Sequence, residues 1–91
     1  LGDGLARHRR TEAEALRFSV YPNPFRNATT VALGTGEHHL KVYNSTGALV
    51  HEVNEARGEV VLRAENLGTG VFLLQVQDEK GQRRTQKFMV R

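Results

Sequence analysis

Several residue types and patterns are missing from this chain of 91 residues. It has no cysteine, which excludes disulfides and thiolate metal sites. Its apolar stretches all fall short of the roughly 20 residues that a membrane-spanning helix needs, so we expect no membrane insertion. The chain starts at Leu1 without a signal peptide, which predicts that it is a fragment and that any secretion signal lies upstream. This length predicts one small domain with a modest core.

Alternating apolar residues predict short β-strands from Leu16 onward. Seven such segments, turn residues about every ten positions and no helical period predict an all-β fold. The expected architecture is a small antiparallel β-sandwich of about seven strands, similar to immunoglobulin or fibronectin domains. The side chains expected in its core are Phe18, Val20, Val31, Leu33, Leu40, Val42, Val50, Leu62, Leu67, Phe72, Leu74, Val76, Phe88 and Val90. Residues 1–15 lack the alternation and carry two glycines among charges, so we expect a linker there and the domain at 16–91.

Glycine positions specify the turns. Asn44-Ser45-Thr46-Gly47 fits a type I turn in which Gly47 takes the left-handed conformation. This hairpin would place Val42 opposite Val50. Gly70 precedes an apolar strand, and we expect it either to have a positive φ or to lie where a Cβ would clash.

Positive charge is concentrated at the end of the sequence. The net charge is +3, and residues 82–91 carry four basic residues and no acidic one. The charge can protect a sheet edge against aggregation, or it can be recognised by a partner. Nucleic-acid binding is disfavoured, because the six aromatic residues fall mostly at core-like positions instead of along a basic face.

Four segments, in order, resemble a known family. They are Val20-Tyr21-Pro22-Asn23-Pro24-Phe25, Val42-Tyr43-Asn44-Ser45-Thr46-Gly47-Ala48-Leu49-Val50, Leu67-Gly68-Thr69-Gly70-Val71-Phe72, and Thr85-Gln86-Lys87-Phe88-Met89-Val90-Arg91. Together they resemble the type A C-terminal sorting domain of the bacterial type IX secretion system, over about residues 16–91. Asn44 stands where the family usually has Asp, and Ala48 where it has a basic residue.

The resemblance implies a secretion signal. A covalently attached upstream cargo would reach the periplasm, be carried across the outer membrane by the type IX translocon, and be secreted or held at the cell surface. A cell-surface sortase would usually cut within or near residues 1–15. The residues expected to form the recognition motif are Tyr21, Pro22, Asn23, Pro24, Phe25, Gly47, Gly70, Lys87, Phe88, Val90 and Arg91.

The proline-containing segment also has a purely structural explanation. Two prolines fix φ and hold Tyr21 and Asn23 extended, which would deliver Phe25 into the core at a set angle. The structural role and the recognition role are compatible, because rigid exposed segments bind at lower entropic cost.

Catalytic and metal chemistry find little support in the sequence. The nitrogen ligands available to a metal ion are His8, His38, His39 and His51. His39 and His51 could be diagonal neighbours on one face, but a third ligand is not evident. The default interpretation is that these are solvated surface histidines. The two serines, Ser19 and Ser45, lie on a strand and in a turn instead of a nucleophile elbow. We therefore expect no enzyme, no cofactor and no metal. The alternatives to a sorting domain are an accessory module that binds glycan or protein, and a structural spacer.

Overall fold

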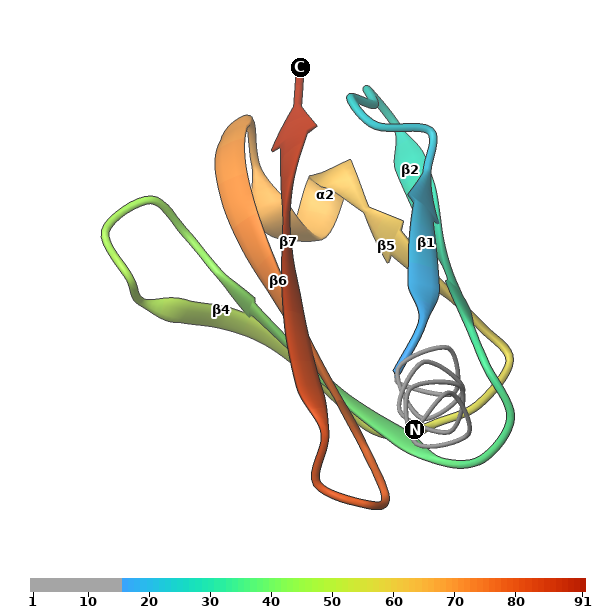
Figure 1. The fold of residues 1–91 in the computed structure, drawn as a ribbon. Coiled ribbons are helices and arrows are strands. Elements are labelled where there is room, and N and C mark those ends of the chain that lie inside the picture. The colour runs from blue at the N-terminus through green and yellow to red at the C-terminus, as the bar shows by residue number, and fades with distance from the viewer. Residues whose placement is uncertain (1–15) are drawn as a thin grey trace, which may run out of the picture.

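The computed structural model describes residues 16–91, which form two stacked antiparallel sheets (Figure 1). The three-stranded sheet has the order β1-β2-β5, and its strands are β1 (Phe18–Tyr21), β2 (Ala28–Leu33) and β5 (Glu59–Arg63). The four-stranded sheet has the order β4-β3-β6-β7, and its strands are β3 (His38–Tyr43), β4 (Leu49–Ala56), β6 (Gly70–Asp78) and β7 (Arg83–Val90). A single helical turn, α2 (Ala64–Leu67), joins β5 to β6. The predicted seven-stranded sandwich is confirmed, while the predicted linker lies outside the described residues.

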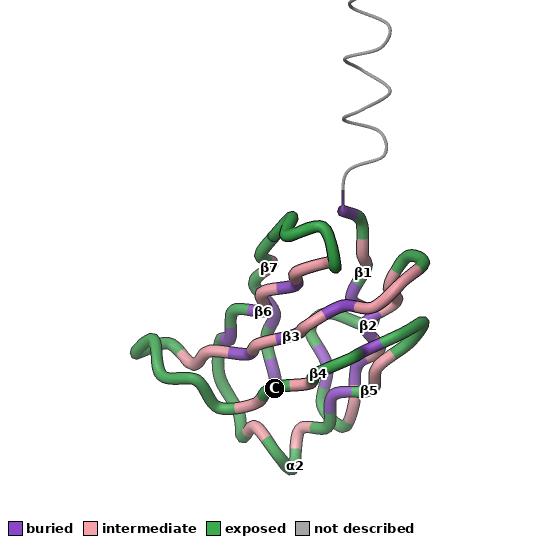
Figure 2. The backbone as a smooth tube through the Cα atoms, turned by 90° about the horizontal axis from the view of Figure 1, so that it is seen from below, coloured by how far each residue is buried: buried purple, intermediate pink, exposed green. Residues whose placement is uncertain are grey.

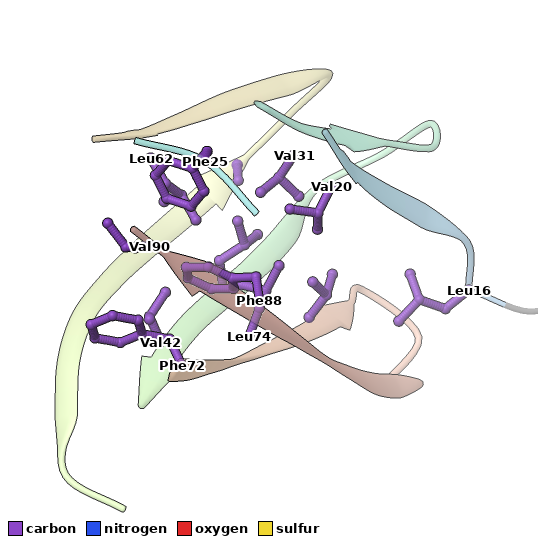
Figure 3. Close-up of a cluster of buried hydrophobic side chains, with 13 residues drawn as sticks. Leu16, Val20, Phe25, Val31, Val42, Leu62, Phe72, Leu74, Phe88 and Val90 are labelled. Carbon is purple, nitrogen blue, oxygen red and sulfur yellow. The ribbon is translucent and has the colours of Figure 1, made fainter. Parts of the chain in front are cut away.

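The core lies between the two sheets, where buried positions recur along the facing strands (Figure 2). Val31, Leu40, Val42, Leu74 and Val76 are completely buried, as their alternation predicts. Figure 3 shows the same cluster with aromatic rings at one end and Leu16 at the other. Each fully buried aliphatic or aromatic side chain stabilises the fold by roughly 1.5–3 kcal/mol relative to exposure.

Val50 corrects the predicted core. It is 38% exposed, because a β-bulge shifts the hairpin between β3 and β4. Tyr43 pairs with Leu49 and Val42 pairs with His51, so Val50 is the extra residue, and the predicted pairing of Val42 with Val50 is wrong. A one-residue shift moves side chains to the other face of a sheet, which is why the alternation failed here. Three other expected core residues are only partly buried and pack against the cluster: Phe18, Leu33 and Leu67.

Two hairpins of the four-stranded sheet have the same loop construction. In the β3–β4 loop, the side-chain Oδ1 of Asn44 accepts hydrogen bonds from the backbone N–H groups of Thr46 and Ala48. In the β6–β7 loop, Asp78 Oδ1 accepts the equivalent bonds from Lys80 and Gln82. Asn44 and Asp78 therefore have the same role. The side-chain oxygen of each accepts hydrogen bonds from the N–H groups two and four residues later in the loop.

Gly47 closes the first of these loops as predicted. Its φ is +89°, and its N–H donates to the Asn44 carbonyl at 2.9 Å. Gly70, at the start of β6, has a φ of +135°, with open space where its Cβ would be. The positive φ expected for both glycines is confirmed.

The left-handed conformation at Gly47 predicts the effect of a β-branched side chain. Gly47→Val should lower the free energy of unfolding by about 1 kcal/mol or more, since the penalty comes from the backbone and not from crowding. Urea unfolding checks this, with Ser45→Val as the control in the same turn, where φ is not positive. Equal stability of the two variants would contradict the turn assignment.

Candidate recognition site

The loop between β1 and β2 lies along the outer edge of β7. Asn23 bridges that edge: its Nδ2 donates to the Lys87 carbonyl at 3.2 Å, and its Oδ1 accepts from the Met89 N–H at 3.1 Å. Phe25 continues the pairing as a parallel bridge, with its N–H bonded to the Met89 carbonyl at 3.0 Å and its carbonyl to the Arg91 N–H at 2.8 Å. The first and last segments of the predicted motif thus form one hydrogen-bonded unit, and Figure 1 shows the β1–β2 loop near the end of β7.

Contacts with the three-stranded sheet hold the other side of this loop. Thr29 is completely buried, and its hydroxyl donates to the Pro22 carbonyl at 2.7 Å. Tyr21 is 48% exposed, and its hydroxyl donates to the Glu59 carboxylate at 3.3 Å. The negative charge of Glu59 raises the pKa of the Tyr21 phenol above its ordinary value, with smaller contributions from desolvation and this hydrogen bond. The Tyr21–Phe25 segment is therefore fixed to both sheets.

Three aromatic rings connect the segment to the core. Phe25 is 3% exposed, and its ring centroid lies 5.8 Å from that of Phe88. Phe88 in turn stacks on Phe72 at 5.6 Å (Figure 3). Such aromatic pairs contribute about 0.5–1.5 kcal/mol beyond the burial of their area. The predicted entry of Phe25 into the core is confirmed, and Pro22, Asn23 and Pro24 remain exposed beside it.

The remaining motif residues divide between this unit and the β3–β4 hairpin. Gly70 pairs with Val90, which is 2% exposed, so the start of β6 also joins the unit. Gly47 lies in the β3–β4 loop, where it lines a hollow that Lys87 also lines. Lys87 and Arg91 are exposed, as expected for the charged side chains of the last strand.

Part of the β7 edge stays uncovered. Because the backbone groups of Met89 and Arg91 point to this edge, strand alternation directs those of Thr85 and Lys87 the same way. Within residues 16–91, the N–H groups of Thr85 and Lys87 have no hydrogen-bond partner. The basic side chains of Arg83 and Arg84 flank this stretch, so an open backbone edge coincides with positive charge.

Leu16 covers the far end of the β7 edge. Its N–H donates to Gln82 Oε1 at 3.0 Å, and its carbonyl accepts from an Arg84 guanidinium nitrogen at 3.2 Å. Leu16 is itself 5% exposed. Leu16 starts the first alternating segment, directly after the predicted linker, but it was not among the residues expected in the core.

His38 contradicts the default expectation of a solvated surface histidine. His38 is 4% exposed, and its Nδ1 lies 3.1 Å from the Gly36 carbonyl, so it is a core residue and not a surface one. His39 contacts Glu52 at 2.5 Å on the outer face, whereas His51 pairs with buried Val42. The suggested His39–His51 neighbours are therefore on opposite faces, since the bulge changed the register. Within residues 16–91 no three potential ligands are grouped for a metal ion, and His8 lies outside the described residues.

Among residues 16–91, no helix has both the length and the apolar composition of a membrane span.

The fold is an immunoglobulin-like β-sandwich. A family model for the secretion system C-terminal sorting domain matches residues 19–91. The chain belongs to this family, and the resemblance seen in the sequence is confirmed.

Solved structures share the sandwich fold of this domain. The surface component PorZ of the type IX secretion system of Porphyromonas gingivalis matches 81% of the chain with 27% identity and a TM-score of 0.68. The chain spans only 11% of the length of PorZ. A DUF3244 protein from Bacteroides vulgatus with an immunoglobulin-like sandwich has the same TM-score of 0.68 at 11% identity, with 81% of this chain and 84% of that one covered, and shows the fold alone. CopC from Methylosinus trichosporium OB3b is a more distant likeness, with a TM-score of 0.50, 20% identity and coverage of 84% and 89%. No curated protein matches the chain.

The two hydrogen bonds of Asn23 predict a measurable contribution to stability. Asn23→Ala should lower the free energy of unfolding by about 1–3 kcal/mol, because it removes two bonds worth roughly 0.5–1.5 kcal/mol each. Thermal and urea unfolding measure this directly. Asn27→Ala is the matched control, since the exposed side chain of Asn27 makes no hydrogen bond within residues 16–91 and should change stability by less than about 0.5 kcal/mol. If the two variants are equally stable, Asn23 does not hold the edge of β7.

Proposed function

We propose that this domain is the sorting signal of a cargo protein attached upstream of Leu16, and that it directs the cargo through the type IX translocon. The cargo reaches the cell surface or the medium after passing through the periplasm. A sortase at the surface cuts within or near residues 1–15, a linker between cargo and signal. The domain itself is a substrate of this machinery and supplies no catalytic residue.

The observation that carries the proposal is the union of the two terminal motifs. The Tyr21–Phe25 segment and the Lys87–Arg91 segment are far apart in sequence, yet four hydrogen bonds and the Phe25–Phe88 contact join them. Together with the family match over residues 19–91, this supports a signal that is recognised as a folded surface. A rigid surface loses little conformational entropy on binding, which favours recognition in the folded state.

The accessory-module alternative has weaker support. A glycan-binding face normally displays several exposed aromatic rings, but Tyr21 is the one aromatic side chain among the exposed large hydrophobic residues of 16–91. The hydroxyl of Tyr21 is already bonded to Glu59. The exposed large residues on the rest of this surface are aliphatic, which fits a protein partner better than a sugar.

Transfer of export tests the sorting function. The 91-residue chain, fused behind a signal peptide and a reporter, should direct the reporter outside a cell that has the type IX system. The same fusion should accumulate in the periplasm of a translocon-deletion strain. Fractionation and reporter activity measure both, and equal export from the two strains would refute the proposal.

The exposed charges of the last strand give a second test. Lys87→Gln with Arg91→Gln should leave the domain folded, because surface substitutions usually change stability by less than about 0.5 kcal/mol. If the translocon reads these charges, a reporter fused to the folded double variant should accumulate in the periplasm. Normal secretion of that variant would instead assign the charges to protection of the sheet edge.

A further inference from the structure

The outer face of the four-stranded sheet is divided into an apolar half and a polar half. In the apolar half, Tyr43 lies between Leu49 and Leu73, and Leu73 pairs on its other side with Lys87. Val71 and Met89 form the next pair along the same strands. The polar half starts with the following row, where Gln75 lies between Lys41 and Thr85.

The apolar half is exposed. Leu49, Val71, Leu73 and Met89 are each between 38% and 48% exposed, and they account for four of the seven large hydrophobic residues exposed in 16–91. We call these four residues and Tyr43 the outer patch. Contiguous exposed apolar surface on a small soluble domain commonly marks an interaction site.

A shallow hollow of about 490 Å³ opens within the outer patch. Tyr43, Val71, Leu73 and Lys87 line it together with residues of the β3–β4 loop. A concave apolar site of this kind accepts a large side chain, whereas a flat lipid surface contacts protruding groups. The hollow therefore favours a protein segment over a membrane.

The positive charge around the outer patch favours a partner that carries negative charge. The three segments that build the outer patch, residues 38–51, 66–77 and 82–91, contain no acidic residue. Lys87 and Arg91 are exposed beside the patch and have no salt-bridge partner within residues 16–91. A second copy of this domain docked through the same face would bring these basic groups together with no carboxylate between them, so self-association is disfavoured.

We infer that the outer patch docks a protein segment in which large apolar side chains alternate with Asp or Glu, with one apolar side chain in the hollow and a carboxylate on Lys87. This inference rests on the proposed sorting function. It specifies the chemistry of the partner surface that binds the domain. Leu73 provides the central apolar contact, because it pairs with both Tyr43 and Lys87. Lys87 selects for negative charge and speeds the encounter.

Peptide titration of the full 91-residue chain tests the docking. The probes are two ten-residue synthetic peptides with the same alternating Leu and Phe residues, one with Glu and one with Lys between them. In amide NMR spectra, the Glu peptide should shift resonances of Tyr43, Leu73 and Lys87 and bind at least about tenfold more tightly than the Lys peptide. Its affinity should fall as salt is added.

Two variants make the test specific. Leu73→Thr should weaken binding of the Glu peptide about tenfold or more, since the loss of one buried leucine side chain corresponds to a factor of that size. Val61→Thr is the matched control, because Val61 is 51% exposed on the other sheet and should leave the affinity unchanged. Lys87→Glu should reverse the preference in favour of the Lys peptide.

Four outcomes would overturn the inference. They are failure of the Glu peptide to bind, equal binding of both peptides, a dimer in sedimentation that Leu73→Thr abolishes, and Leu73-dependent binding to vesicles of anionic phospholipid. An export assay separates this inference from the sorting function itself. If the unaltered fusion is exported and the Leu73→Thr fusion is exported equally well, the docking inference fails alone. If the unaltered fusion is not exported, the sorting proposal fails, and the peptide titration still decides the chemistry of the patch.

Discussion

The pairing of the Tyr21–Phe25 segment with the outer edge of β7 is the interaction on which the rest of the structure depends. An uncovered sheet edge offers unpaired N–H and C=O groups to any other strand. Asn23 and Phe25 bond to the Lys87 carbonyl, to both backbone groups of Met89 and to the Arg91 N–H, and they place the Phe25 ring against Phe88. The Tyr21–Phe25 loop thus covers the end of the β7 edge, adds Phe25 to the core, and holds the end of β7 in a defined position.

The same pairing links fold to function. The structural explanation of the proline-containing segment is compatible with the proposed recognition role, because the contacts that bury Phe25 also leave Pro22, Asn23 and Pro24 exposed. The outer patch includes Met89 of β7 and continues on β6, where Leu73 pairs with Lys87. A partner that contacts the last strand therefore also meets the hollow that Lys87 lines and the Tyr21–Phe25 loop at the edge of β7.

Local patterns predicted most of this fold, and long-range bonds explain what they missed. The alternation of Leu74 and Val76 and the turn at Gly47 needed only neighbouring residues, so both were predicted correctly. The predicted burial of Val50 was wrong, because a β-bulge depends on how two strands pair and not on the sequence of one strand. The contacts of Asn23 with the last strand join residues 64 and 66 positions apart, and the sequence around Asn23 specifies only an exposed, proline-flanked amide. The motif residues were identified through family resemblance, whereas their union came from the fold.

Hydrogen exchange along β7 in the unaltered chain tests the central claim most directly. The amides of Phe88 and Val90 face β6 and should exchange slowly, as sheet amides do. The account predicts that the outward amides of Met89 and Arg91 are also protected, by Asn23 and Phe25, while those of Thr85 and Lys87 on the same edge exchange fast. Exchange at Met89 and Arg91 as fast as at Thr85 and Lys87 would contradict the joining of the two motifs.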